Sequence, residues 1–164
     1  MADVFPSQKR SQIMAAVKGK DTSIELTVRK TLHAMGYRYR LDNGHLPGRP
    51  DLTFRSAKIA VFINGCFWHG HSCKRGKRVP KTNHEYWLWK IGRNVERDKR
   101  TRKELTSMGW RVCVVWECQV GSGMKRLCRL LESTAPGLPP CVDDPQEFIR
   151  DDCVRMNGST AQEE

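Results

Sequence analysis

A chain of 164 residues, 38% of them hydrophobic, is long enough to build one domain around its own core and too apolar for an intrinsically disordered protein. No apolar stretch approaches the roughly 20 residues that a membrane-spanning helix requires, and the first ten residues lack the apolar core of an export signal. We therefore expect a cytoplasmic protein without membrane contacts. The 29 Lys and Arg residues outnumber the 18 Asp and Glu residues, which favours a polyanionic partner.

The charge is divided unevenly along the chain. Residues 1–134 hold 27 Lys and Arg against 11 Asp and Glu, a net charge of +16, whereas residues 135–164 hold two against seven, a net charge of −5. We expect one basic domain over 1–134, followed by a loosely ordered, acidic, proline-containing tail over 135–164. Such a domain attracts nucleic acid, although a merely basic, soluble surface is the alternative.

The first predicted elements are helices. Residues 7–20 have the pattern of a short basic helix with a weak apolar face, and Asp21–Ser23 offer capping oxygens to a second helix. That helix covers Ile24 to Met35, with apolar residues at helical spacing, and it ends at Gly36. Residues 37–41 then have the pattern of a strand.

The rest of the chain alternates between strands and helices. The turn-rich segment Leu46–Asp51 leads into strands. We predict strands over 52–55, 58–63 and 111–116 and helices over 83–108 and 124–132. Because residues 111–116 are almost uninterruptedly apolar, that strand is expected to be covered on both faces. The order predicts an α/β fold, with a mixed β-sheet flanked by helices.

Cysteine and histidine residues crowd the loop after the second strand. Cys66, His69, His71 and Cys73 lie within eight residues, and Cys118 follows a later strand whose end could come close. Seven cysteines without an export signal are more typical of thiols and metal ligands than of disulfides. Three thiolates and one imidazole form a closed structural zinc site, but the spacing leaves open which histidine binds.

An acidic residue begins the first of these strands. The Asp51 carboxylate could hold a hard cation such as Mg²⁺ together with a backbone carbonyl of the neighbouring strand, and the cation would polarise a phosphodiester. Whichever of His69 and His71 is free of zinc could act as general base toward water. Taken alone, Asp51 also suits a turn residue after proline.

Several motifs together closely resemble the very-short-patch mismatch-repair endonuclease family (Vsr), within the PD-(D/E)XK nuclease superfamily. The resemblance runs from about residue 11 to residue 118. The motifs are Leu46–Asp51 (LPGRPD), Gly65–His69 (GCFWH) with His71 and Cys73, Lys90–Asp98 (KIGRNVERD), Gly109–Val112 (GWRV) and Val115–Cys118 (VWEC). The resemblance implies a restriction-endonuclease-like mixed sheet with a structural zinc site.

The resemblance also implies a role for each site residue. Mg²⁺ would be bound by the Asp51 carboxylate and the Ile63 carbonyl, and His69 would be the general base. Glu25 and Asp98 would lie in the outer shell of the site and hold metal-bound waters. The implied zinc ligands are Cys66, His71, Cys73 and Cys118.

One position departs from the family pattern. The residue after the metal-binding carbonyl is usually His in the family and Lys in the superfamily, whereas this chain has Asn64. Asparagine can hydrogen-bond phosphate or water but cannot carry positive charge or transfer a proton. Phe62 likewise replaces the second acid of the superfamily signature, which is normal for the family. Asn64 therefore bears on the rate rather than on the type of chemistry.

Aromatic residues accompany the basic ones. The resemblance implies that Phe67, Trp68 and Trp87, here called the wedge, enter the major groove beside a mismatched pair. Met14 would press from the minor groove, and Lys90 and Asn94 would contact base edges. The remaining tryptophans are expected to pack in the core. They are Trp89, Trp110 and Trp116.

These expectations describe a monomeric, nucleoid-associated enzyme that uses Mg²⁺ to nick the T-containing strand of double-stranded DNA at G·T mismatches left by deamination of 5-methylcytosine. Mismatch-repair proteins are a further candidate partner. One alternative, suggested by Asn64, is a zinc-stabilised DNA-binding module that is catalytically weak or inactive. Another is a restriction-type endonuclease that cuts both strands. The presence of Asp51, His69, Glu25 and Asp98 argues against the first alternative, and the wedge argues against the second.

Overall fold

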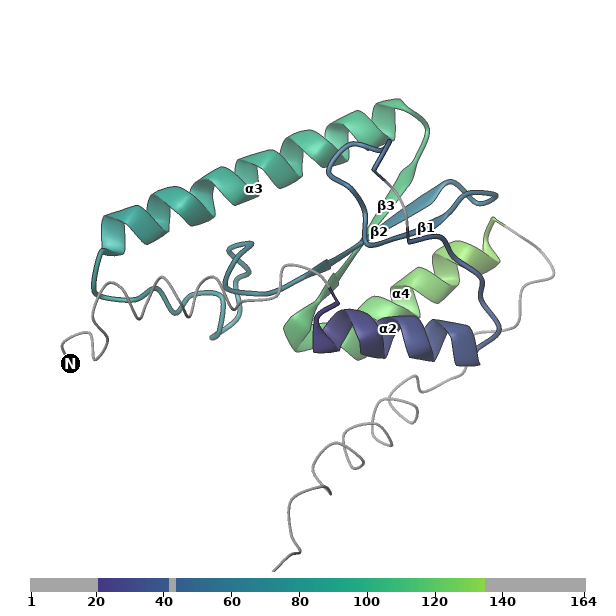
Figure 1. Ribbon diagram of the computed structural model, residues 1–164, viewed down its shortest axis with the longest axis horizontal. Coiled ribbons are helices and arrows are strands. Elements are labelled where there is room, and N and C mark those ends of the chain that lie inside the picture. Colours follow the sequence, from purple (N-terminus) through teal and green to yellow (C-terminus); the bar gives the residue numbers. More distant parts are fainter. Residues whose placement is uncertain (1–20, 42–43, 135–164) are drawn as a thin grey trace, which may run out of the picture.

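Figure 1 shows the computed structural model, which describes residues 21–41 and 44–134. The predicted helix over 7–20, with Met14, and the predicted tail over 135–164 lie outside these residues. The elements are α2 (Ser23–Ala34), β1 (Leu52–Phe54), β2 (Ile59–Asn64), α3 (His84–Ser107), β3 (Arg111–Trp116), the 3-10 turn η1 (Glu117–Gln119) and α4 (Val120–Glu132). None of the helices within the described ranges is long and apolar enough to cross a membrane.

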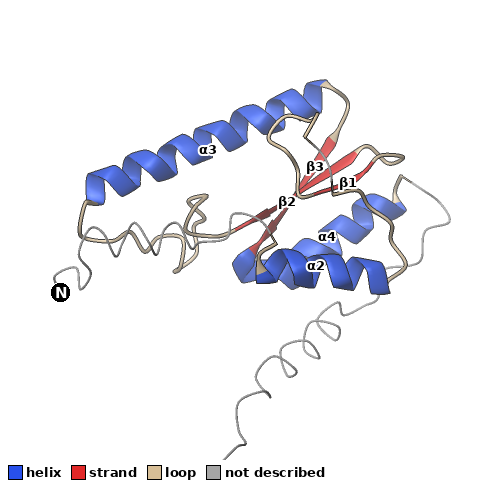
Figure 2. Ribbon diagram, viewed as in Figure 1, coloured by secondary structure: helices blue, strands red, loops and turns tan. Residues whose placement is uncertain are grey.

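The three strands form one mixed sheet in the order β1-β2-β3. β1 and β2 are an antiparallel hairpin in which Leu52 pairs with Val61, and β2 and β3 are parallel, with Asn64 opposite Trp116. The parallel pair requires a crossover, which α3 supplies. Figure 2 shows helices on both sides of the sheet, so the mixed α/β architecture predicted from the element order is confirmed.

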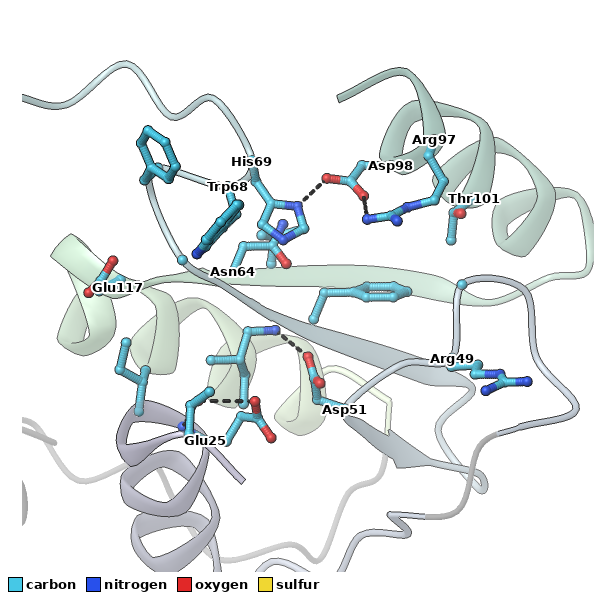
Figure 3. Close-up of a pocket in the computed structure, with 18 of the residues that line it drawn as sticks. Glu25, Arg49, Asp51, Asn64, Trp68, His69, Arg97, Asp98, Thr101 and Glu117 are labelled. Carbon is cyan, nitrogen blue, oxygen red and sulfur yellow. Dashed lines mark hydrogen bonds and ion pairs between the residues drawn. The ribbon is translucent and has the colours of Figure 1, made fainter. Parts of the chain in front are cut away.

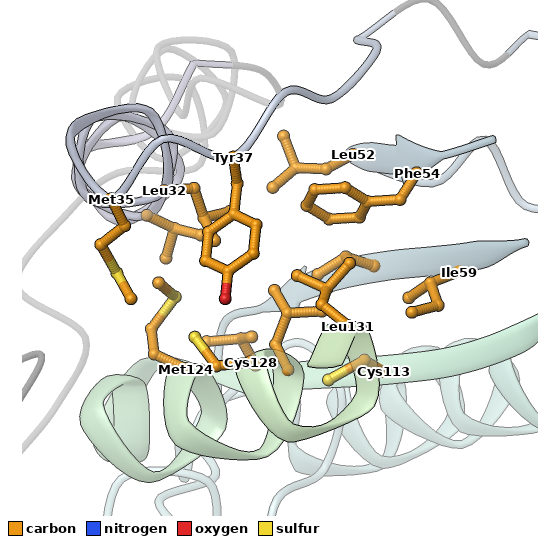
Figure 4. Packing of buried hydrophobic residues seen from close by; sticks show 14 of the residues in the cluster. Leu32, Met35, Tyr37, Leu52, Phe54, Ile59, Cys113, Met124, Cys128 and Leu131 are labelled. Carbon is orange, nitrogen blue, oxygen red and sulfur yellow. The ribbon is translucent and has the colours of Figure 1, made fainter. Parts of the chain in front are cut away.

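The larger core lies between the sheet and the pair α2 and α4. Because strand side chains alternate between faces, Ile59 and Val61 of β2 point to this side. They pack in one cluster with Leu32 of α2 and with Met124 and Leu131 of α4 (Figure 4). All five side chains are fully buried. This core fixes the sheet against the two helices and leaves its other face for α3.

The opposite face of the sheet carries a smaller core. Ala60 of β2 packs with Leu105, near the C-terminal end of α3, and Phe62, Trp110 and Val112 pack partly against them. Figure 1 shows the N-terminal half of α3 extending well beyond the sheet. The strand face next to this small core is partly open, because Phe62, Asn64 and Val112 line a cavity there.

Two sequence predictions about these elements need correction. Residues 37–41 do not form a strand, since their only ladder contact in the described structure is a single bridge from Arg40 to Thr53. Helix α4 begins at Val120 rather than Met124. Its first turn contains Gly121 and Gly123. Glycine at position 123 lets the helix pack closely on β3, because a Cβ there would lie 3.0 Å from Val115.

The prediction that Trp89 packs in the core is wrong. Its side chain is 58% exposed, because it lies on a face of α3 that packs against neither core cluster of the described residues. Trp110 does pack against the smaller core, as predicted. Trp116 is half-buried, and its ring lies 4.3 Å from that of His71.

Candidate active site and metal centre

A cavity of about 700 Å³ opens on the α3 side of the sheet. Figure 3 shows that its walls come from the start of α2, the β1–β2 hairpin, the loop after β2 and the middle of α3. The cavity therefore brings together side chains from distant parts of the sequence. The residues of the predicted active site that line it are Glu25, Asp51, Ile63, Asn64, His69 and Asp98.

Asp51 lies at the start of β1, where it faces the end of β2. The backbone N–H of Ile63 donates a hydrogen bond of 2.7 Å to Oδ2 of Asp51. The N–H and C=O groups of one strand residue point to the same edge of the strand. The Ile63 carbonyl therefore points to the edge of β2 that faces Asp51. Burial raises the pKa of the Asp51 carboxyl from 3.8 to about 6, and the bond from Ile63 opposes that rise.

His69 lies in the loop after β2 and is held by a residue of α3. Its Nδ1 pairs with the carboxylate of Asp98 (Figure 3). The Arg97 guanidinium lies 3.7 Å from the other oxygen of that carboxylate. The pairing occupies Nδ1 and leaves Nε2 as the ring nitrogen available to a molecule in the cavity.

Glu25 lines the cavity but is already engaged at the N-terminus of α2. Thr22 caps this helix by accepting the Glu25 N–H, and the Glu25 carboxylate in turn accepts the Asp21 N–H and the Thr22 hydroxyl. The Arg29 guanidinium, one helical turn further, donates to the same carboxylate at 3.0 Å. Glu25 is 5% exposed, so this cation offsets a nearly buried negative charge beside Asp51.

Arg29 is a site residue that the sequence analysis missed. An i, i+4 Glu–Arg pair on a helix is usually a solvated surface contact, so its spacing alone carries no functional signal. Only the fold shows that this pair is nearly buried and that its carboxylate, Glu25, lines the cavity.

Asn64, the position that departs from the family pattern, ends β2 on the cavity side of the sheet. Its side chain is 7% exposed, and it shares its strand face with Phe62, two residues earlier. The amide is thus placed beside the His69 ring (Figure 3), where it can donate to or accept from a bound molecule.

The predicted metal ligands converge beside this cavity. One ligand atom from each of Cys66, His71, Cys73 and Cys118 lies within 4.8 Å of the others. His69 is not among them. A hydrogen bond with the His71 ring lowers the pKa of the Cys73 thiol to about 6, which favours the thiolate that a metal ion requires. The four residues can therefore hold one metal ion.

The loop around this cluster is tightly constrained. The His71 N–H bonds to the Cys66 carbonyl, and a Cβ on Gly76 would lie only 2.0 Å from the His71 carbonyl oxygen. Glu117, at the end of β3, accepts the Cys66 N–H and pairs with Arg75 at 2.8 Å. These contacts, together with Cys118, fasten the loop to the end of β3.

The wedge aromatics come from two elements, since Phe67 and Trp68 belong to the loop after β2 and Trp87 belongs to α3. The ring centroid of Phe67 is 5.0 Å from that of Trp68 and 5.6 Å from that of Trp87. Trp87 is buried, whereas the other two are half-buried. Asn94 donates a hydrogen bond of 2.9 Å to the Trp68 carbonyl, and Lys90 Nζ lies 5.6 Å from the Trp68 ring centroid.

Hydrolysis of a phosphodiester requires a place for a cation, a group that accepts a proton from water, and a basic surface for the phosphate backbone. The cavity supplies a buried carboxylate and a paired imidazole within a strongly basic domain. These are features that a nuclease requires.

Comparison with known proteins identifies the kind of nuclease. Residues 2–75 match the family described as DNA mismatch endonuclease Vsr. A type II nicking enzyme of Neisseria meningitidis serogroup A is 44% identical over 129 residues, 79% of this chain and 90% of its own length. The DNA mismatch endonuclease Vsr of Escherichia coli K12 is 46% identical over 118 residues, 72% of this chain and 75% of its own length. The chain belongs to the Vsr family and is a DNA endonuclease.

Proposed function

We propose that this enzyme uses Mg²⁺ to nick the T-containing strand of duplex DNA at G·T mismatches, the product of 5-methylcytosine deamination. The proposal is supported by the names of the relatives, which include a DNA mismatch endonuclease and nicking enzymes. The observation that carries it is that Asp51 and His69 line one cavity, while His71 rather than His69 joins the cysteine cluster.

We propose a catalytic role for each of the residues that the family resemblance singles out and that line the cavity. Asp51 and the Ile63 carbonyl would hold Mg²⁺, which when bound polarises the phosphodiester and stabilises the charge that develops on it. Nε2 of His69 accepts a proton from the attacking water. Asp98 fixes the ring with Nδ1 protonated and stabilises the cation that forms. The Glu25 carboxylate, which already accepts a hydrogen bond from Arg29, would accept a further one from a water molecule at the cavity wall.

We assign zinc to the cysteine cluster. Three thiolates and an imidazole are the donor set of a closed structural zinc site, and the span of 4.8 Å suits a tetrahedral ion. Zinc would hold the loop that carries His69 and two of the wedge residues, Phe67 and Trp68. The loop has few buried apolar side chains of its own, so we expect its order to depend on the metal.

Mismatch recognition is assigned to the wedge. Phe67 and Trp68 would enter the base stack with Trp87 supporting them from behind, and Lys90 and Asn94 would contact base edges. A mismatched step is already poorly stacked, so opening it costs less than opening a matched one. Met14, for which we propose the minor-groove contact, lies outside the described residues.

One assay tests the proposal. The zinc-loaded protein is incubated with Mg²⁺ and with end-labelled duplexes that are either matched or contain one G·T pair, and the products are resolved on a denaturing gel. We expect a nick in the T strand alone. We also expect Asp51→Ala to abolish nicking while DNA still binds.

Two outcomes would replace the proposal. Cleavage of both strands of matched DNA would indicate a restriction-type endonuclease. Binding without any cleavage would indicate an inactive DNA-binding module, the alternative that Asn64 in place of histidine suggests.

A further inference from the structure

Helix α3 carries two aromatic side chains that the wedge does not include. Tyr86 is 50% exposed and Trp89 is 58% exposed. Three to four residues separate neighbours on one helix face, so these two share a stripe with Lys90, Arg93 and, further along, Arg97. The N-terminal half of α3, which carries the first four of these residues, extends beyond the sheet (Figure 1).

The two rings form a platform rather than two isolated contacts. Their centroids are 6.4 Å apart, with an angle of 33° between the ring planes. The Arg93 guanidinium lies 4.9 Å from the Trp89 centroid. This cation–π contact restrains the tryptophan side chain at the surface and adds a positive charge to the platform.

The platform is continuous with the wedge. The Tyr86 ring lies 5.4 Å from that of Trp87, the buried member of the wedge. Lys90 Nζ lies 5.6 to 5.8 Å from the ring centroids of Trp68, Tyr86 and Trp87, which places one ammonium group between wedge and platform. A DNA strand held at the wedge would therefore meet the platform next.

The groove beside the platform is strongly basic. Arg93, Arg97 and Arg100 line it together with Lys90. Its acidic residue, Glu96, is paired with Lys99 at 2.8 Å, which reduces its effect on an approaching anion. A surface that combines half-exposed rings with a row of cations fits unpaired nucleotides, whose bases stack on the rings while their phosphates meet the cations.

We propose that Tyr86 and Trp89 form a second stacking site, which holds an unpaired DNA base next to the step opened by the wedge. The inference rests on the DNA endonuclease family of this chain and extends the proposed function. The wedge breaks the stacking of one step, and the platform offers the freed base a new stacking partner. The opened state of the substrate is thereby stabilised.

Binding of single-stranded DNA tests the site without any mismatch or cleavage. We would measure the anisotropy of a labelled 12-nucleotide oligonucleotide with the zinc-loaded protein in Mg²⁺-free buffer. Trp89→Ala and Tyr86→Leu should each weaken binding about 10-fold, the size expected of one stacked base. Trp89→Phe should retain most of the affinity because it keeps a ring. Arg93→Gln should reduce the slope of log Kd against log salt by about one.

Leu88→Ala is the matched control, because Leu88 is 50% exposed on the neighbouring face of the same helix. It should bind the oligonucleotide like the wild type. Wild-type affinity of Trp89→Ala, or an equal loss in Leu88→Ala, would overturn the proposal. All variants alter exposed side chains, and thermal melting should verify that they remain folded.

Duplex substrates distinguish stacking of an unpaired base from contact with paired DNA. Trp89→Ala should weaken binding to a G·T duplex more than binding to the matched duplex. Equal loss on both would mean that the platform contacts paired DNA, which would overturn the stacking role. If the wild type shows no preference for G·T, the proposed mismatch function fails, while the single-strand result still decides on the platform.

Discussion

The carboxylate of Asp98 pairs with Nδ1 of His69, linking the middle of α3 to the loop that follows β2. The two residues are 29 positions apart in the sequence, and the pairing depends on α3 crossing over that loop. The arrangement leaves Nε2 of His69 as the available ring nitrogen, as the proposed proton-accepting role of this residue requires.

Asp98→Asn should lower the nicking rate about 100-fold, within the range expected of general-base catalysis. The asparagine amide can donate to Nδ1, which would place the imidazole proton on Nε2 and block acceptance of a proton from water. Single-turnover nicking of a G·T duplex measures the effect. Glu104→Gln, a change of an exposed carboxylate near the C-terminal end of the same helix, should leave the rate unchanged. Equal losses in both variants would refute the role of Asp98.

Asp51→Asn should stabilise the protein when Mg²⁺ is absent. The folded state binds the Asp51 proton more tightly than the unfolded state, because burial raises the pKa from 3.8 to about 6. Ionisation therefore destabilises the fold as pH rises above about 4, by about 3 kcal/mol once the pH is well above 6. Asparagine avoids this cost and can still accept the Ile63 N–H.

Urea unfolding at pH 8 and pH 5, with zinc retained, would measure this gain. At each pH the variant is compared with the wild type, so that effects of pH on the rest of the protein cancel. The gain should fall to about half at pH 5. A gain that does not change with pH would show that the buried charge is not its cause.

Arg29→Met should destabilise the fold by about 3 kcal/mol, because it leaves the nearly buried Glu25 carboxylate without its cation. The double variant with Glu25→Gln should recover part of that loss. Unfolding of the two single variants and the double variant gives the coupling energy directly. Lys99→Met removes an exposed Lys–Glu pair and should cost less than about 0.5 kcal/mol. If the changes in unfolding free energy of the two single variants add up to that of the double variant, the two side chains are not coupled.

The zinc assignment can be tested with matched cysteines. Cys118→Ala should lose the metal, measured by native mass spectrometry, because a closed site needs all four ligands. Cys113→Ala should retain one equivalent of zinc, since Cys113 is buried in the larger core between the sheet and helices α2 and α4. If Cys118→Ala retains the metal, or if Cys113→Ala loses it, the metal must be bound by a different set of ligands.

The sequence predicted most of this architecture through local patterns. Thr22 was placed at a helix start by its residue type, and it does cap α2. The ligand types around Cys66 predicted a metal cluster that the fold brings together. Trp89 was assigned to the core because large apolar residues are usually buried, but periodicity carries no information on where a long helix leaves the sheet. The sequence likewise does not predict the role of Arg29, because that role depends on the tertiary burial of its ion pair with Glu25.

Asn64→His should raise the nicking rate at least about 10-fold, because an imidazole at this position could carry charge or transfer a proton beside the scissile phosphate. The side chain at position 64 faces a cavity of about 700 Å³, which has room for the larger ring. Single-turnover nicking measures the gain, and anisotropy with the same G·T duplex shows whether DNA binding has changed instead. Asn64→Ala serves as the control and should nick no faster than the wild type. If the histidine variant is no faster while DNA affinity is unchanged, the residue after Ile63 does not limit the chemistry, and the asparagine is catalytically equivalent to the family's histidine.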